Sequence, residues 1–411
     1  MTYYQFVQEN SRWLAGGFLL CFFSSLGQTF FISLSGGHIR AEYGLTNGEF
    51  GSVYMAATLA SALTLPFLGR LVDKVSVSTT ALIVMPVLGF ACIMMVWSQS
   101  LLMLVITIYL LRLFGQGMMT HTSITAMGRW FSGHRGRAIS VATMGHQTGE
   151  ALLPLTMIGI YALVGWRYSW LVAAAFILLV ALPAVYRLMR IERQPQQADA
   201  VSLRTAPRHW QRREVLRDPL FWVMLIGVLA PGFIGTTVFF HQAYLLELRG
   251  WPPELFASAF VAMAIMTMSF AFITGLLIDR FGSPAVLPLY QVPLALCCFT
   301  LATIEAPIGI FIFMALLGVS YGISSTLFGA LWPEVYGTRH LGGVRSITVA
   351  IMVFATAMGP GVTGILIDRG VSYFTQFRVM GTYCLAAAVA MFFVSRVLSQ
   401  RLTRERRAQQ A

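Results

Sequence analysis

Charged residues are scarce in this chain of 411 residues. Asp, Glu, Lys and Arg make up only 11% of the sequence, whereas a soluble domain has about a quarter of its residues charged. Lysine is almost absent, with Lys74 alone among the 28 basic residues. The five cysteines all lie in apolar runs and show neither a disulfide framework nor zinc-ligand spacing. These shortages exclude a soluble domain and a fold stabilised by disulfides or zinc.

Several motifs of catalysis and nucleotide binding are also missing. The sequence contains no GxxxxGK[ST] loop, no GxGxxG after a strand and no HExxH helix. ATP-driven transport and metalloprotease chemistry therefore have no support. Since no convergent catalytic set is present either, we expect a protein that is not an enzyme and needs no metal or cofactor.

Long hydrophobic runs are what the sequence has in abundance. Hydrophobic residues make up 57% of the chain and the mean hydropathy is +0.72. The runs are roughly 20 residues long, which is the length that a helix needs to cross about 30 Å of hydrocarbon. The pattern predicts an all-α polytopic membrane protein with twelve spans, near 13–35, 47–68, 78–97, 101–123, 137–163, 168–190, 219–245, 254–277, 284–303, 307–331, 343–366 and 375–397.

The basic residues predict the orientation of these spans. If both termini are cytoplasmic, 22 Lys and Arg residues lie inside and five lie outside, as the positive-inside rule requires. We therefore expect a multi-pass protein of a bacterial inner membrane with both termini in the cytoplasm. This distribution explains the net charge of +12 without a nucleic-acid partner. The basic tail, 398–411, could contact anionic lipid.

The chain is predicted to consist of two related halves. The only long hydrophilic stretch, 191–218, would be a cytoplasmic linker between six-span bundles at 1–190 and 219–397. A shift of 206 residues superimposes five identical pairs, namely Gly44 and Gly250, Phe50 and Phe256, Ala56 and Ala262, Gly69 and Gly275, and Asp73 and Asp279. A constant shift indicates duplication, and paired six-span halves suit transport by alternating access.

The loops resemble those of the major facilitator superfamily. The resemblance rests on Gly69, Asp73 and Lys74 in GRLVDK, on Gly275, Asp279 and Arg280 in GLLIDR, and on the basic loops 129–138 and 333–346. It implies two pseudo-symmetric six-helix bundles around a central cavity. It also implies that Asp73 and Asp279 help to hold the inward-closed arrangement.

Two charged residues, Arg112 and Glu150, lie deep within predicted spans. By helical rise, Arg112 is roughly 16 Å from the outer face and Glu150 roughly 20 Å from the inner face. These similar depths predict an ion pair between neighbouring spans four and five. His146 precedes Glu150 by one turn and shares its face. Residues of this kind usually face the protein interior or a water-filled path.

Three roles for this group remain open. Burial favours a neutral glutamate and a nearby arginine favours an ionised one, so Glu150 with His146 could exchange a proton and couple transport to protons. Alternatively, Arg112 and His146 could bind an anionic solute, or the pair could be static and only hold the spans together. Arg112 lies in RLFGQG, which resembles the span-four arginine motif of many proton-coupled facilitators. Gly145 and Gly149 form a GxxxG spacing that would suit close packing between the halves.

The resemblance implies that spans one, four, seven and ten line the cavity. Their polar side chains are Ser24, Ser25, Gln28, Thr29, Gln116, Thr236, Thr237, His241, Gln242, Ser320, Tyr321, Ser324 and Ser325. A few neutral hydrogen-bonding groups in an apolar cavity suit a small polar or amphipathic solute. The excess of Arg and His over acid favours an organic anion.

The sequence thus predicts a secondary transporter of a small organic solute, coupled to protons and functional as a monomer. Its partners would be the solute, H⁺ and membrane lipid. The first alternative is a proton-driven exporter of amphipathic drugs, although the antiport motif expected in span five is replaced by GEALLP. A transport-like membrane sensor is the remote alternative.

Overall fold

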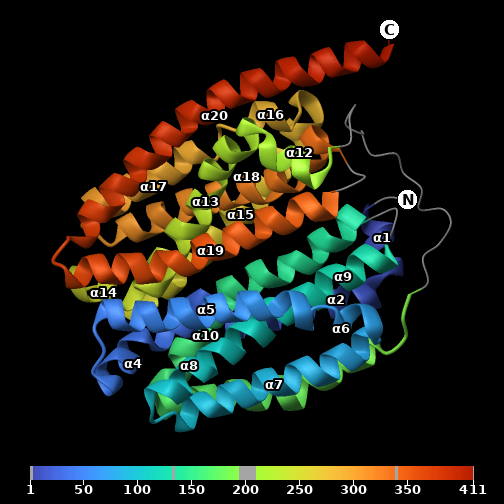
Figure 1. The fold of residues 1–411 in the computed structure, drawn as a ribbon. Coiled ribbons are helices and arrows are strands. Elements are labelled where there is room, and N and C mark those ends of the chain that lie inside the picture. The colour runs from blue at the N-terminus through green and yellow to red at the C-terminus, as the bar shows by residue number, and fades with distance from the viewer. Residues whose placement is uncertain (1–2, 132–134, 194–209, 338–340, 411) are drawn as a thin grey trace. The chain divides into compact units, whose positions relative to one another are not determined.

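The computed structural model describes residues 3–131, 135–193, 210–337 and 341–410, without the side chains of residues 3, 73, 135, 279, 341–343, 345, 346 and 406–410. These residues form helices and connecting turns, with no strand among them (Figure 1). The all-α prediction is therefore confirmed.

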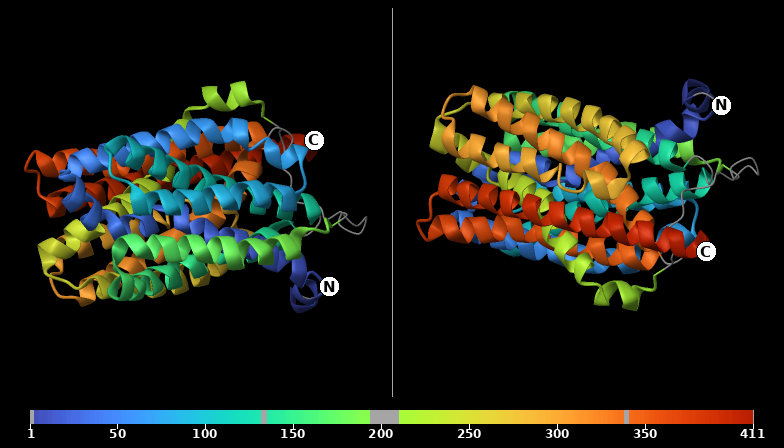
Figure 2. Two further views of the ribbon diagram at one scale, coloured as in Figure 1. Left: turned by 90° about the horizontal axis from the view of Figure 1, so that it is seen from below. Right: turned by 90° about the horizontal axis from the view of Figure 1, so that it is seen from above.

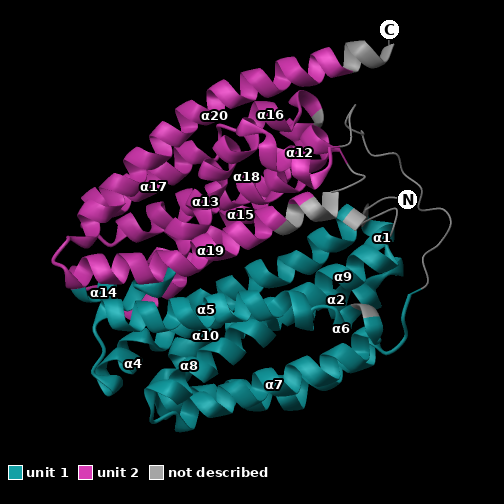
Figure 3. Cartoon of the chain, viewed as in Figure 1, with its two compact units in different colours: residues 1–201, 239–247 teal, residues 202–238, 248–411 magenta. Residues whose placement is uncertain are grey.

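The chain divides into two compact units (Figure 3). Unit 1 comprises residues 1–201 and 239–247, and unit 2 comprises residues 202–238 and 248–411. The division near residue 201 falls inside the predicted linker, 191–218. The assignment of 239–247 to unit 1 was not predicted from the sequence.

The helices of unit 1 are α1 (Tyr3–Glu9), α2 (Ser11–Ser24), η1 (Ser25–Gly27), α3 (Thr29–Ile32), η2 (Ser33–Ser35), α4 (Gly36–Tyr43), α5 (Asn47–Leu68), α6 (Leu71–Lys74), α7 (Val77–Trp97), α8 (Leu101–Leu110), η3 (Leu111–Met119), α9 (Thr120–Trp130), α10 (Arg135–Phe176), η4 (Ile177–Ala181) and α11 (Leu182–Met189). Local chemistry sets several of their ends. Thr46 and Glu49 form a capping box that starts α5, and Gly44 ends α4 with φ 63°.

Unit 2 is built from α12 (Arg212–Arg217), α13 (Pro219–Phe240), α14 (Gln242–Arg249), α15 (Pro253–Phe281), α16 (Ser283–Val286), α17 (Gln291–Thr303), α18 (Ile308–Tyr336), α19 (Leu341–Asp368) and α20 (Tyr373–Gln410). The ends of α13 and α14 fall on both sides of the division. Within each unit the long helices run along a common direction (Figure 2).

Close helix packing in both units depends on glycine. A Cβ added at Gly318 of α18 would lie 2.4 Å from the carbonyl oxygen of Met263 on α15, and one at Gly145 of α10 would lie 2.1 Å from that of Phe18 on α2. These two helix pairs share the most extensive contacts in their units. The GxxxG spacing in span five therefore does bring helices together, but the partner is α2 of unit 1 and the expected role between the halves is wrong.

Ten helices of the described chain are long and apolar enough to span a membrane, or eleven if the bent pair Ser11–Gly27 and Thr29–Tyr43 is one span. One of the ten runs from Gly136 to Met189 and is 54 residues long. It is interrupted at Gly165, where φ 78° and ψ 163° are not helical. Counting its two sides separately would give the predicted twelve spans.

Candidate solute-binding site

The first span is broken near its middle. Its two parts, Ser11–Gly27 and Thr29–Tyr43, meet at an angle of 46°, and Gln28 between them is extended, with φ −84° and ψ 156°. A break frees backbone carbonyls from the helical ladder. Such groups are tolerated at membrane depth only where the protein or a water-filled cavity satisfies them.

The fourth span departs from the α-helix at the same place. Residues Leu111–Met119 form a π-helical segment, η3, and π-helical segments occur frequently at functional sites. Gly27 and Gly115 let the two irregular backbones touch, because a Cβ added at Gly27 would lie 2.1 Å from the carbonyl oxygen of Leu111 and 2.8 Å from the Cα of Gly115.

Arg112 projects from this segment onto the break. Its Nη1 donates to the carbonyl oxygen of Gly27 and to the hydroxyl oxygen of Thr29, each at 3.3 Å. The hydroxyl of Tyr54 donates to the same Thr29 oxygen at 2.8 Å, and the Tyr54 ring centroid lies 5.4 Å from the guanidinium carbon. Arg112 is only 2% exposed, and its Nε has no hydrogen-bond partner. The guanidinium can therefore donate a further hydrogen bond through Nε.

Span five approaches the break through α10. A Cβ added at Gly149 would lie 2.3 Å from the hydroxyl oxygen of Ser25, and the His146 ring stacks on Phe30 with centroids 6.2 Å apart. The Nδ1 atom of His146 is buried without a partner. Glu150, one residue beyond the contact, is 6% exposed. Within the described residues, its carboxylate has no hydrogen-bond or ion-pair partner.

The predicted ion pair between Arg112 and Glu150 is therefore not formed. The depths of the two residues are similar, but the free carbonyl at Gly27 and the Thr29 hydroxyl hold the guanidinium on the break. The sequence predicted a continuous first span, in which the Gly27 carbonyl would be bonded within the helix. These acceptors for Arg112 could therefore not be predicted. The structure leaves a buried base and a buried acid that do not neutralise each other.

Some of the predicted cavity residues belong to unit 1. Gln28 and Thr29 form the break, and Gln116 follows Gly115 in η3, where its backbone nitrogen would be 2.7 Å from a Cβ at Gly27. Gln242 is 3% exposed, and its Nε2 donates to the carbonyl oxygen of Phe30 at 3.1 Å and to the hydroxyl oxygen of Ser33 at 2.9 Å.

The other predicted cavity residues belong to unit 2 and mostly bond within it. The hydroxyls of Thr236 and Ser324 donate back to carbonyls of their own helices, the more common role for such residues. The Tyr321 hydroxyl donates to the carbonyl oxygen of Pro231 at 3.3 Å. Thr237 differs, because its hydroxyl is fully buried without a partner. That these residues line a cavity shared with unit 1 stays a prediction.

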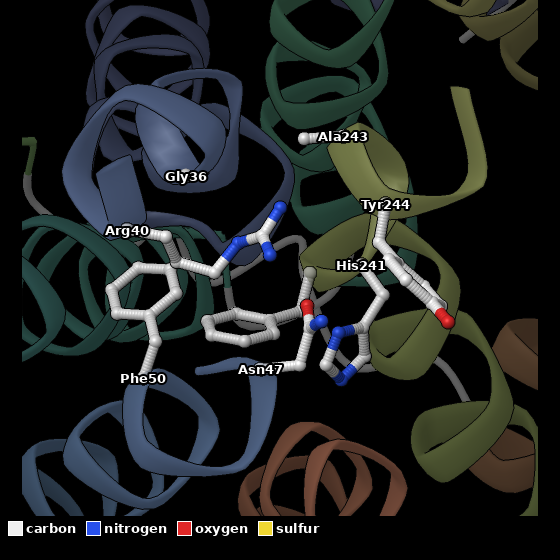
Figure 4. A pocket seen from close by; sticks show the side chains of 8 residues that line it. Gly36, Arg40, Asn47, Phe50, His241, Ala243 and Tyr244 are labelled. Atoms are coloured by element: carbon white, nitrogen blue, oxygen red, sulfur yellow. The ribbon is translucent and has the colours of Figure 1, made fainter. Parts of the chain in front are cut away.

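A small pocket lies elsewhere in unit 1, with an empty volume of about 190 Å³ that includes open solvent. Figure 4 shows Arg40, Asn47 and His241 around it, beside the aromatic ring of Phe50. The Nη2 of Arg40 lies 3.2 Å from a carboxylate oxygen of Glu247. His241, expected in the cavity, is placed here.

Comparison with known proteins decides the family. The sequence profile described as Major Facilitator Superfamily matches residues 17–360 and 243–410. The chain belongs to the Major Facilitator Superfamily. It is thus a multi-pass membrane transporter that carries a small-molecule solute, and not an enzyme.

Relatives within the superfamily are distant. The probable sulfoacetate transporter SauU of Cupriavidus necator is 23% identical over 398 residues, or 90% of each chain. The MFS transporter asaE of Aspergillus flavus is 23% identical over 286 residues, which is 67% of this chain and 61% of that one.

Solved structures show the same fold at lower identity. An inward-facing, unoccupied bacterial homologue of the human lysosomal transporter Spinster superposes with a TM-score of 0.72 at 15% identity, covering 95% of this chain and 98% of the other. The nucleoside transporter NupG gives 0.69 at 14% identity, with 93% and 98% covered.

The loop residues that resemble superfamily motifs lie in helices or directly after one. Gly69 ends α5, where an added Cβ would lie 2.9 Å from the carbonyl oxygen of Leu65. Lys74 ends α6, whereas Gly275 and Arg280 lie in the last part of α15. The side chains of Asp73 and Asp279 lie outside the described residues, so their predicted part in holding an inward-closed arrangement stays a prediction. Nearby, Arg129 donates to the Val72 carbonyl at 3.0 Å.

Proposed function

We propose that the protein moves a small organic anion across the membrane by alternating access, coupled to protons. The observation that supports this proposal is that Arg112 and Glu150 are both buried beside the break in span one and do not pair with each other. A buried charge without a counterion is costly, so a group that enters the site and supplies the missing charge is stabilised there.

Arg112 is the proposed anion ligand. Its Nε has no partner, and its Nη1 bonds to the Gly27 carbonyl and the Thr29 hydroxyl are long, at 3.3 Å each. A carboxylate or sulfonate offers shorter, charge-assisted bonds to the same fork. The similarity to a probable sulfoacetate transporter supports this chemistry, since sulfoacetate carries two such groups.

Glu150 is the proposed proton-coupling residue, with His146 beside it. A carboxyl group can bind and release a proton, and Glu150 is buried without a hydrogen-bond or ion-pair partner among the described residues. Access that alternates between the two sides of the membrane would then let Glu150 take up a proton on one side and release it on the other.

The test is transport by purified protein in liposomes. We expect an inward proton gradient to drive accumulation of radiolabelled sulfoacetate or of another member of a panel of small organic anions. Amphipathic cations form the second panel, and proton-driven movement of cations alone would favour drug efflux and overturn the anion proposal.

The Glu150→Gln variant tests the coupling directly. We expect it to keep exchange of labelled for unlabelled anion but to lose uphill accumulation, because the amide cannot carry the proton. Glu254→Gln is the matched control, since Glu254 is exposed at the start of α15 and should behave as the unaltered protein. Undiminished accumulation by Glu150→Gln would exclude this residue from coupling.

A further inference from the structure

The hydroxyl group of Thr29 accepts two hydrogen bonds within unit 1. Its oxygen accepts one from the hydroxyl of Tyr54 at 2.8 Å and a second from Nη1 of Arg112 at 3.3 Å. A threonine hydroxyl has two acceptor lone pairs and a single proton to donate. Because two donors already occupy the oxygen, the only further hydrogen bond that this group can make is one in which it donates.

The proton of this hydroxyl has no acceptor in the described part of the chain. Among those residues, no hydrogen bond has Oγ1 of Thr29 as its donor, although Thr29 is only 4% exposed. A helical threonine hydroxyl can bond back to the carbonyl four residues earlier, as those of Thr64 and Thr122 do. Thr29 does not, because the extended Gln28 separates it from the preceding helical turn. A buried donor without an acceptor is costly, so a bound molecule that supplies the acceptor is stabilised there.

Tyr54 is packed so that its hydroxyl stays on Thr29. The side chain of Tyr54 is fully buried. Its ring centroid lies 5.4 Å from the guanidinium carbon of Arg112 and 4.7 Å from the ring centroid of Phe240, which also belongs to unit 1. A tyrosine oxygen cannot move without its ring, so this packing fixes the donor. The position of the Tyr54 hydroxyl in turn limits the directions in which the Thr29 proton can lie.

A second donor without an acceptor lies beside the first. Nε of Arg112 is buried without a partner, and it belongs to the same guanidinium whose Nη1 bonds to Thr29. The Thr29 hydroxyl and the Arg112 Nε are therefore neighbouring donors. A carboxylate or sulfonate has two or more acceptor oxygens on one atom and can accept from both donors at once, whereas an alcohol or ketone offers a single oxygen.

We propose that Thr29 is a solute-binding residue, which donates its hydroxyl proton to an oxygen of the anionic group held by Arg112. Tyr54 is then a positioning residue that directs this proton and does not touch the solute. The two donors together favour a solute that carries a carboxylate or sulfonate over an uncharged solute of the same size. This inference rests on the proposed function, in which Arg112 is the anion ligand.

Binding of defined anions by the full-length protein in detergent tests the proposal. The probes are sulfoacetate, acetate and methanesulfonate, with acetamide as the uncharged analogue, and Kd is measured by equilibrium titration. We expect Thr29→Val to raise the Kd of each bound anion about tenfold or more, because a hydrogen bond to a charged group is lost. Thr29→Ser keeps the hydroxyl and should stay within about twofold of the unaltered protein. Tyr54→Phe keeps the ring but no longer directs the Thr29 proton, and we expect a rise in Kd of about threefold.

Transport rates separate solute binding from general stability. In liposomes, Thr29→Val should raise the KM of anion exchange and leave the maximal rate nearly unchanged, because Thr29 does not carry the coupled proton. A purely structural defect would instead lower the maximal rate and the yield of folded protein. Thr156→Val and Tyr168→Phe are the matched controls, since both side chains are exposed, and both should behave as the unaltered protein.

The outcomes distinguish this inference from the proposed function. An unchanged Kd for the anions in Thr29→Val would overturn the role of Thr29 and leave Arg112 as the anion ligand. If Thr29→Val does not fold, an unchanged Kd in Tyr54→Phe overturns it instead. Anion binding that depends on Thr29 without proton-driven accumulation would support the inference and contradict only the proposed coupling. Failure of the unaltered protein to bind any anion of the panel would overturn both.

Discussion

At the scale of single residues, the arginine of span four has two tasks. Arg112 donates to a carbonyl that the broken helix leaves free, and in the proposed function its unpartnered Nε would bind the solute. A lysine could not donate to both groups with the same geometry, because its ammonium is a point charge without the planar fork of a guanidinium. Arg112→Lys is therefore expected to fold less stably and to bind anions more weakly.

Thr29 is the hydroxyl on which Tyr54 and Arg112 converge. In Thr29→Val the shape is kept and the shared acceptor is lost, which should cost about 1–3 kcal/mol because two buried donors lose a partner. Thermal unfolding in detergent measures the effect. Thr382→Val is the control, since that exposed hydroxyl bonds only to its own helix, and a loss as large as that of Thr29→Val would argue against the assignment.

At the scale of helices, the break in span one and the π-helical segment of span four form one structural element. They touch through Gly27 and Gly115, where there is no room for a side chain. Each irregular backbone fits closely against the other at this position. The contact between the two segments therefore requires glycine at both positions.

Alanine at either glycine should separate the two helices. Gly27→Ala places a Cβ 2.1 Å from a backbone oxygen, and Gly115→Ala places one 2.7 Å from the Cα of Gly27. We expect a loss of about 1–3 kcal/mol or more from overpacking, measured as yield of folded monodisperse protein and thermal stability. Gly159→Ala has nothing within 4 Å of the added atom and should be neutral.

The regular parts of this fold could be predicted from sequence, and the irregular parts could not. Apolar runs located the helices well; the predicted span 47–68 coincides with α5. Hydropathy does not register a 46° bend at Gln28 or a π-helical turn, because neither changes the polarity of the run. For this reason Arg112 and Glu150 were recognised as a buried acid and base, while their pairing was predicted wrongly.

At the scale of the whole molecule, duplication explains more than the number of helices. The contact between the glycines of α10 and α2 in unit 1 has its counterpart in unit 2, where a Cβ added at Gly359 of α19 would lie 2.7 Å from the carbonyl oxygen of Phe233 on α13.

The orientation of the chain can be tested with single cysteines. All five native cysteines are buried, so a membrane-impermeant maleimide should not reach them in intact cells. We expect Gln8→Cys to be labelled only after the membrane is opened and Ala306→Cys to be labelled in intact cells, because the basic residues predict that the first is inside and the second outside. Reversed labelling would contradict the predicted topology.

The last helix has a practical consequence for such measurements. The 38 residues of α20 extend about 57 Å at the rise of an α-helix, well beyond the roughly 30 Å of a bilayer core. Its final turns therefore extend beyond the bilayer core, and a fluorophore or spin label at the exposed Thr403 would report distances within unit 2 from outside the membrane.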